Sequence, residues 1–342
     1  MCILRAVIRL RLIYVMRRLI GTMPFRTWSL SCLRGDMENQ KPFLTVEEQV
    51  ELLRSRGMGF RDEDEAKRIL WQESYHSVVN GYKDLFIDQE RSKEAGEDRY
   101  KPGTVFEDLY KLFLFDRALR EASFQTIVEC EASMRNAAVY AFCDRYREED
   151  SYLNRNHYCG AESFRDPDHY ENELDNLMGH FESSREGKNR RPYVVHYLDK
   201  YGHVPLWVLV NTLTFGNVSH FYSILPRSIQ DEACKIISKT QRVKRLSRKR
   251  LGNAFSALVE FRNICAHDER LYCARTGPRK GRYFSSMLMA MRRVMNEGSY
   301  SEFSETVARL VGLFDYSPDL KEAILREMRI EIQGEKAIPL IG

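Results

Sequence analysis

Residues 104–147 limit the possible fold more than any other part of this sequence. Their apolar side chains recur every three to four positions, which is the spacing of one face of a helix. Thr104 and Glu107 also have the spacing of a capping box, a pattern that opens helices. We therefore predict a long helical stretch here, with one break near residues 121–123.

The remainder of the chain also favours helices. Thr45 and Glu48 form another capping box, which predicts a helix through about Arg56. We expect a further helix over residues 251–267 and about three more over residues 284–332. No alternation of apolar and polar residues is long enough for a convincing strand, and no repeat or glycine-rich phosphate-binding motif is visible. These patterns predict an all-α fold.

Two junctions between helices can be located as well. Asp62 or Asp64 can cap the helix that follows the first one. The sequence of residues 212–219 suggests two helices that meet at Gly216. The apolar run before them is expected to be buried, which makes Trp207 a core residue in this interpretation.

Composition divides the chain into three parts. Residues 1–36 hold seven arginines, no lysine and one acid, so we interpret them as a basic leader that is either non-native or disordered. Without it, 46 basic residues stand against 48 acidic ones, a net charge of −2. An N-terminal helical region over residues 37–100 and a helical domain over 101–335 follow. The charged, irregular stretch at about 148–192 is interpreted as a loop insertion.

The leader has two interpretations. Met37 opens a conventional N-terminal sequence, which favours translation from that residue. Alternatively, residues 1–36 are made and form a basic amphipathic helix at a membrane surface. Arginines interrupt every window long enough to span a membrane, so we expect no membrane association unless this leader is expressed.

The eight cysteines argue against a metal site. None forms a Cys-x-x-Cys pair, and no cysteine or histidine cluster has zinc-ligand spacing. No group of carboxylates suggests magnesium either. Scattered, unpaired cysteines are typical of a reducing cytosol. We expect a cytoplasmic protein that needs no metal and no cofactor.

The motif whose residue types suit catalysis is the hexapeptide of residues 262–267, which contains Arg262, Asn263 and His267. A guanidinium binds two phosphate oxygens, stays charged, and can stabilise the negative charge that builds up when a 2′-hydroxyl attacks phosphorus. An imidazole titrates near neutrality and can move the protons. Asn263 can orient the histidine or bind a phosphate oxygen. These residue types suit RNA cleavage.

Helix geometry restricts how the motif can work. Asn263 and His267 share a helix face, whereas Arg262 and His267 lie roughly 140° apart on an ideal helix. Either the helix ends or bends near Cys265, or a second copy of the chain completes the site in a symmetric dimer. In the alternative, purely structural interpretation, Arg262 pairs with an acid and His267 is an interior histidine. The short pattern alone favours that alternative.

The surrounding sequence changes this balance, because residues 41–272 resemble the Abi-like (AbiD/AbiF) abortive-infection family of the HEPN superfamily. The family-like segments, in chain order, are residues 54–58, 73–76, 81–82, 103–110, 115–120, Glu129, Glu131, Arg135, 205–207, 215–219, 262–267 and 270–271.

The resemblance implies a HEPN-type helical bundle with additional N-terminal helices, metal-independent RNA cleavage, and a role in bacteriophage defence or as a toxin. It assigns the catalytic roles to Arg262, Asn263 and His267, and it implies a homodimer with a composite active site. Relatives sometimes carry a nucleotide-accepting tyrosine two residues after the histidine, where this chain has Glu269. Asn211 stands where the family commonly has an acid.

A basic run directly before the motif helix is a candidate RNA-binding surface, because positive side chains neutralise phosphates. Its members are Arg242, Lys244, Arg245, Arg248, Lys249 and Arg250. A solvated basic face is the alternative. Tyr201 and His203 can stack on bases.

Two groups of polar residues are expected to be structural. Arg135 should pair with Glu129 or with Glu131, which stands at helical ion-pair spacing. Asp116, Arg117 and Arg120 should form an internal polar network, from which some members can reach the active site.

Two functions follow from these observations. The first is an endoribonuclease that acts on RNA as an effector of phage defence or as a toxin. The second is a non-catalytic HEPN module that binds a structured non-coding RNA or a protein partner such as an antitoxin. The intact motif favours the enzyme, because a binding module has no need to keep both Arg262 and His267.

Overall fold

The structure is a computed structural model that describes residues 43–163 and 167–340. From Val46 onward the chain forms one compact unit, to which the following description refers. This unit consists of helices and one small antiparallel sheet, so the predicted all-α fold is confirmed. The predicted basic leader, residues 1–36, lies outside the described residues.

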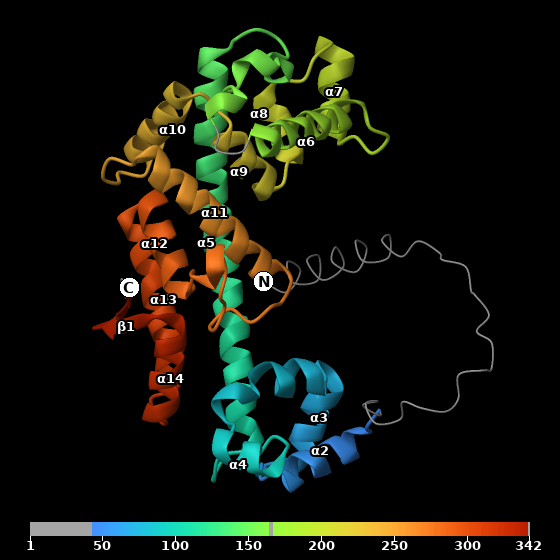
Figure 1. Ribbon diagram of the computed structural model, residues 1–342, viewed down its shortest axis with the longest axis vertical. Helices are drawn as coiled ribbons and strands as arrows, with labels where there is room; N and C mark the ends of the chain where they lie inside the picture. The colour runs from blue at the N-terminus through green and yellow to red at the C-terminus, as the bar shows by residue number, and fades with distance from the viewer. Residues whose placement is uncertain (1–42, 164–166, 341–342) are drawn as a thin grey trace, which may run out of the picture. The chain divides into compact units, whose positions relative to one another are not determined.

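The central element is α5 (Phe106–Arg145), a single helix of 40 residues. At 1.5 Å per residue it is about 60 Å long, and other helices pack along it (Figure 1). The prediction of a break near residues 121–123 was wrong. Residues 106–145 contain neither glycine nor proline, and Ser123 and Ile127 continue the buried face without interruption.

The prediction of a capping box at the start of α5 was also wrong. Val105 occupies the N-cap position and makes no side-chain cap. The Oε1 atom of Glu107 instead accepts hydrogen bonds of 2.9 Å from the backbone N–H groups of Arg61 and Asp62. Glu107 therefore supports the start of a different helix, α3 (Glu63–Glu73), whose N-cap is Asp62 as predicted.

Short N-terminal helices surround the first turns of α5. These elements are α2 (Val46–Ser55), α3, a π-helical turn (His76–Asn80), a 3-10 turn (Lys83–Leu85) and α4 (Gln89–Ala95). The predicted first helix is confirmed, and it ends before Gly57, whose φ of 93° is in the region that favours glycine. Tyr82 packs edge-on against Phe113 of α5 at 5.4 Å.

The segment interpreted as a loop insertion contains regular structure, so that prediction was wrong. Residues 167–186 form α6 (Pro167–Glu186), and Leu174, Leu177 and Phe181 of this helix are buried. The charged residues that suggested a loop lie on its exposed face. Because apolar residues recur at helical spacing between them, the helix buries one side and leaves the other solvated.

Three more helices pack with α6 near the last turns of α5. They are α7 (Pro192–Tyr201), α8 (Leu206–Leu209) and α9 (Phe215–Ser223). Phe142 of α5 contacts Phe221 of α9 at 5.5 Å. The prediction that two helices meet at Gly216 was wrong, because α9 already begins at Phe215. Thr214 caps this helix by accepting a hydrogen bond from the backbone N–H of Asn217.

The C-terminal half adds α10 (Arg227–Thr240) and α11 (Arg248–Ala266), both in contact with α5. Three further helices follow, as predicted: α12 (Phe284–Val294), α13 (Glu297–Gly312) and α14 (Pro318–Met328). A hairpin of β1 (Ile330–Gln333) and β2 (Lys336–Pro339) pairs Ile330 with Pro339 and was not predicted, because each strand has only four residues.

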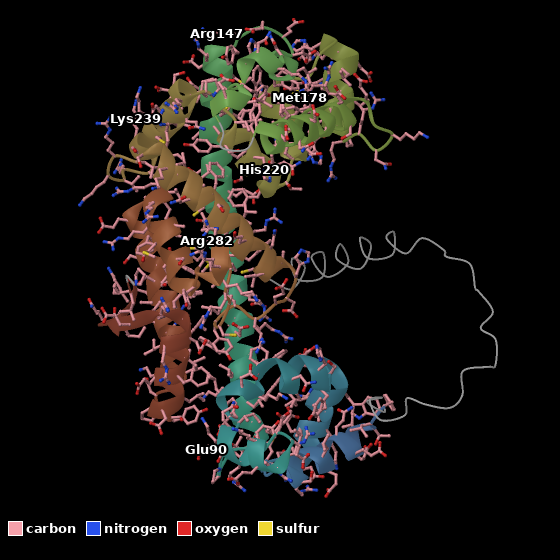
Figure 2. The ribbon with its side chains drawn as sticks, viewed as in Figure 1. Glu90, Arg147, Met178, His220, Lys239 and Arg282 are labelled. Carbon is pink, nitrogen blue, oxygen red and sulfur yellow. The ribbon has the colours of Figure 1, made fainter. Side chains whose placement is uncertain are left out.

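Side chains join α11 to the segment that precedes α12. Arg282, labelled in Figure 2, donates hydrogen bonds of 2.8 Å to Ser256 and to Glu260 of α11. Phe255 and Phe261 of α11 are completely buried. These contacts hold α11 on several sides and so set the position of its C-terminal end.

Candidate active site at the end of α11

The motif lies where α11 ends. Ala266 is the last helical residue, and His267 is the C-cap, whose backbone N–H donates to the carbonyl oxygen of Asn263 at 2.9 Å. Asp268 then adopts a left-handed conformation with φ of 58°. The sequence allowed two geometries for the motif, a helix that ends near Cys265 or a site completed by a second chain. The helix end near Cys265 is present.

Arg262 is half-buried against α5. Its Nε atom lies 4.0 Å from Oε2 of Glu131, and the two side chains are 23% and 15% exposed. Glu131 also forms the predicted ion pair with Arg135, at 3.6 Å. The distance of 4.0 Å is too long for a hydrogen bond, and the Arg262 guanidinium makes none within the described part of the chain. Its Nε atom is buried without a hydrogen-bond partner there, so the terminal Nη atoms are the donors left to bind an anion.

Asn263 and His267 are exposed. Across residues 43–163 and 167–340, neither side chain makes a hydrogen bond or an ion pair, so Asn263 does not orient His267 in the single chain. The structural interpretation of the motif thus holds in part: Arg262 has an acidic neighbour, but His267 is not an interior histidine. The imidazole is accessible to a substrate.

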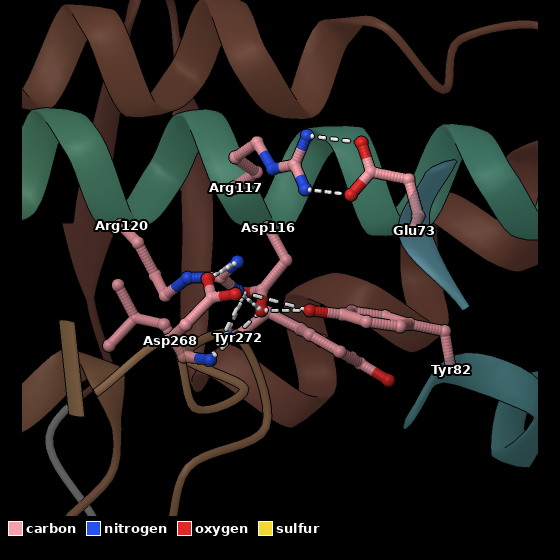
Figure 3. A network of polar contacts seen from close by, with 8 residues as sticks. Glu73, Tyr82, Asp116, Arg117, Arg120, Asp268 and Tyr272 are labelled. Carbon is pink, nitrogen blue, oxygen red and sulfur yellow. Dashed lines mark hydrogen bonds and ion pairs between the residues drawn. The ribbon is translucent and has the colours of Figure 1, made fainter. Parts of the chain in front are cut away.

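A buried network fixes the chain directly after His267 (Figure 3). Asp116 of α5 is fully buried and accepts from the hydroxyl of Tyr82 at 2.8 Å and from Nη1 of Arg120 at 2.6 Å. It also accepts from the backbone N–H groups of Leu271 at 3.1 Å and Tyr272 at 2.8 Å. The predicted internal network of Asp116, Arg117 and Arg120 is confirmed for Asp116 and Arg120, which anchor residues 268–272 to α5, but not for Arg117.

The outer parts of this network reach the motif and the N-terminal helices. Nη2 of Arg120 donates to Oδ1 of Asp268, the residue that follows His267. Arg117, on the same helix, makes two hydrogen bonds to Glu73, of 2.9 and 2.6 Å, and none to Asp116 or Arg120. No sequence pattern indicated the contact of Arg120 with Asp268, because 148 positions separate the two residues.

Burial governs the protonation of several groups around the site. Burial raises the pKa of the Asp116 carboxyl, while the charge of Arg120 and the donated hydrogen bonds oppose the rise. Burial likewise raises the pKa of Glu131, against the charges of Arg262 and Arg135. The pKa of the Cys265 thiol rises to about 12 because the side chain is withdrawn from water. The Cys265 thiol is therefore uncharged at neutral pH.

The basic run lies at the opposite end of α11 from the motif. Arg250 and His267 are separated by 17 residues, which is roughly 25 Å along a helix axis. Arg248 pairs with Asp231 at 3.4 Å. Arg248 and Lys249 border a hollow of about 310 Å³ between α9, α10 and α11. Within one chain, the basic run is therefore beside this hollow and not beside His267.

The expectation that Trp207 belongs to the core was wrong. Its neighbours Leu206 and Leu209 are buried, but Trp207 itself is 60% exposed, and Tyr201 is 51% exposed. The helix α8 is short and packs on one side only, so a residue one position after a buried one points away from the core. An apolar run in the sequence did not distinguish these two sides.

Other features of the described residues bear on the chemistry. Their six cysteines form no disulfide. No group of three or more histidine, cysteine, aspartate or glutamate side chains in residues 43–163 and 167–340 is arranged to hold a metal ion. None of the helices in these ranges combines the length and apolar character needed to cross a bilayer.

The fold and the motif define an all-α protein whose candidate site lies at one helix end. A family model described as Abi-like protein matches residues 68–273, well over half of the chain, and includes the motif. The chain therefore belongs to the Abi-like family, which confirms the resemblance noted in the sequence. No curated protein and no solved structure matches it.

Proposed function

We propose that this protein is a metal-independent endoribonuclease that acts in abortive infection of bacteriophage-infected cells or as a toxin-like effector. Membership of the Abi-like family suggests the defence role. The proposed activity rests on the accessibility of the two charged or titratable side chains of the motif. His267 is exposed at the end of α11, and the Arg262 guanidinium nearby makes no hydrogen bond among the described residues.

In the proposed reaction, the 2′-oxygen of RNA forms a bond to the adjacent phosphorus while the bond from phosphorus to the 5′-oxygen breaks. The products are a 2′,3′-cyclic phosphate and a 5′-hydroxyl. His267 would take the proton from the 2′-hydroxyl or give one to the leaving oxygen. Arg262 would bind the phosphate oxygens, whose negative charge increases in the transition state. Asn263 would donate to one of the same phosphate oxygens.

A symmetric dimer would complete this chemistry. One proton must leave the 2′-hydroxyl while another reaches the 5′-oxygen, and each chain has one His267. Two copies would supply both a base and an acid at one composite site. Phe124 and Val128 support such a contact, because they expose 39% and 43% of their surface one turn apart on α5. Phe124 follows Arg120 by four residues, so these side chains lie on the side of α5 near Asp268.

The basic run would then hold the RNA away from the point of cleavage. Lys249, Arg250 and their neighbours lie at the start of α11, where they would neutralise phosphates several nucleotides from the scissile bond. Lys239, on the last turn of α10, adds a further positive charge to this region (Figure 2). This surface contributes affinity without sequence preference.

The test is cleavage of a labelled RNA by the purified full chain in the presence of EDTA. Wild-type protein should produce fragments with 2′,3′-cyclic phosphate ends, and His267→Ala and Arg262→Ala should each lose the activity. The matched controls are His180→Ala and Arg326→Ala, which remove exposed side chains of the same types on α6 and α14. Cleavage by both motif variants at the rate of the wild type would refute the proposed site.

The contact of Arg262 with Glu131 supports a second function, because a structural role could preserve this arginine without catalysis. In this alternative, the protein is a non-catalytic module that binds a structured non-coding RNA or a protein partner. Tight binding of RNA without cleavage by the wild type, unaffected by His267→Ala, would favour this second function.

A further inference from the structure

A cleft of about 570 Å³ lies beside the last turns of α5. Its walls come from α5, from residues 146–152 and from α8. Its volume is in the range of small-molecule and side-chain binding sites. Asn136, at one end of the cleft, follows Glu131 by five residues, which is roughly 8 Å along α5. The cleft is thus a neighbour of the candidate active site but not part of it.

Two aromatic side chains of the cleft expose their rings. Tyr140 is 66% exposed and Trp207 is 60% exposed. Within the part of the chain that the structure describes, neither ring contacts another ring or a cation, and neither side chain makes a hydrogen bond. The floor between them is apolar, with Val139, Leu206 and Val210 buried. Two accessible rings over an apolar floor suit a flat guest that stacks.

The rim of the cleft is acidic. Four carboxylates line it, Asp144, Glu148, Glu149 and Asp150, against one guanidinium, Arg147, which Figure 2 labels. Asp144 pairs with Arg147 at 2.5 Å, and Asp150 pairs with Arg185 at 3.1 Å.

Glu148 and Glu149 instead have histidine neighbours, His157 at 3.1 Å and His203 at 3.7 Å, and Glu149 is the more exposed of the two, at 77% against 57%. Within the part of the chain that the structure describes, no arginine or lysine pairs with Glu149. Glu149 can therefore accept from an incoming cation, and the negative rim disfavours phosphate groups.

We propose that this cleft binds an arginine side chain of a protein partner. The guanidinium is planar, so it stacks on Tyr140 and Trp207, and it donates two parallel hydrogen bonds to a carboxylate such as Glu149. A lysine side chain has the charge but no planar group to stack on the rings. A nucleotide has a planar base, but its phosphate would approach four carboxylates. This proposal stands independently of the ribonuclease activity.

The test measures fluorescence anisotropy of a labelled Ser-Gly-Arg-Leu-Arg-Gly-Ser peptide with the full chain. Trp207→Ala and Tyr140→Ala should each weaken binding by roughly three- to tenfold, the range of a cation–π contact. Trp71→Ala is the matched control, because Trp71 is 73% exposed on α3. Glu149→Gln should weaken binding several-fold, whereas Glu129→Gln, an exposed acid of α5 outside the cleft, should not.

Two further ligands decide between the possible guests. Replacing both arginines of the peptide with lysine should weaken binding by a similar factor. The proposal is overturned if the wild type fails to bind the arginine peptide, or if Trp207→Ala binds it as tightly as the wild type. It is also overturned if a labelled single-stranded RNA, rather than the peptide, loses affinity in Trp207→Ala and Tyr140→Ala. All variants alter exposed side chains, and an unchanged melting temperature confirms that they fold.

Discussion

Arg120 on α5 donates to Asp268, the residue that directly follows the candidate catalytic residue His267. The same guanidinium donates to the buried carboxylate of Asp116, which accepts from the backbone of Leu271 and Tyr272. Residues on both sides of a tight turn are therefore tied to one position in the middle of α5. This arrangement makes the location of His267 depend on α5 as well as on α11.

The first prediction concerns Asp268, whose φ of 58° is tolerated by glycine and asparagine. Asp268→Gly keeps the backbone conformation but removes the hydrogen bond from Arg120, so kcat of RNA cleavage should fall by roughly ten- to a hundredfold while KM changes little. Asp268→Asn keeps an acceptor and should retain most of the activity. Glu269→Gln is the control, because it removes the same charge one residue later. A decrease in KM alone would show that Asp268 only repels the substrate.

The second prediction concerns the buried carboxylate of Asp116. Asp116→Ala leaves Arg120 partly uncompensated and two backbone N–H groups without their acceptor. The free energy of unfolding should decrease by about 3–5 kcal/mol. Urea denaturation measures the change, and Glu129→Ala, at an exposed position of the same helix, should alter stability by less than about 0.5 kcal/mol. Similar effects of the two substitutions would contradict a stabilising network.

The third prediction concerns pH and Glu131. Burial raises the pKa of Glu131 above its value of 4.5 in the unfolded chain, so the folded state holds the proton more tightly. Its contribution to stability is complete below the unfolded pKa and is lost as pH rises through the folded pKa. Glu131→Gln cannot ionise, and its free energy of unfolding should therefore decrease less than that of the wild type between about pH 4 and pH 7.

Urea denaturation across this range measures the difference between the two proteins. Glu129→Gln, at an exposed position two residues earlier, should follow the wild type. Parallel curves for the wild type and Glu131→Gln would mean that Glu131 titrates alike in the folded and unfolded states.

The fourth prediction concerns Cys265, which lies inside the motif. Its pKa of about 12 leaves almost no thiolate at pH 8, and thiolate is the reactive form. Iodoacetamide should leave Cys265 unmodified in the native protein, as shown by peptide mass spectrometry, and should modify it after denaturation. Cys265→Ala should keep RNA cleavage within about twofold. Loss of cleavage in Cys265→Ala without loss of stability would require a chemical role for the thiol.

The fifth prediction concerns the basic run. If it binds RNA, the double variant Lys249→Ala with Arg250→Ala should weaken binding of RNAs of different sequence to a similar extent. The slope of log affinity against log salt should decrease by about one for each phosphate that the protein no longer neutralises. Arg91→Ala with Lys93→Ala, on the exposed surface of α4, is the control. If the double variant in the basic run has the same salt dependence of affinity as the control double variant, the basic run is a solvated surface that does not bind RNA.

Local signals in the sequence predicted local structure well. Asp62 caps α3, and Arg135 pairs with Glu131 one helical turn away. These features depend on residues only a few positions apart, whose chemistry determines the contact. The contact of Arg262 with Glu131 and that of Arg120 with Asp268 depend on how α11 crosses α5. No short pattern carries that information.

The errors have the same physical origin. Trp207 was expected to be buried because its neighbours are apolar, but tertiary packing covers only one side of α8. Glu107 was assigned to the start of its own helix, yet it accepts from the backbone at the start of α3. The charged residues of α6 concealed a helix whose apolar positions are buried. Local pattern identifies a helix more reliably than it identifies what that helix contacts.

The continuity of α5 places strict limits on changes in chain length. Asp116, Arg120 and Glu131 all meet the segment formed by α11 and the residues after it. Adding one residue between Arg120 and Glu131 would rotate everything beyond it by about 100° and advance it by about 1.5 Å. Glu131 would then turn away from Arg262 while Arg120 stayed in place. Members of this family should therefore tolerate insertions in the turns at either end of α5, and hardly any between these two residues.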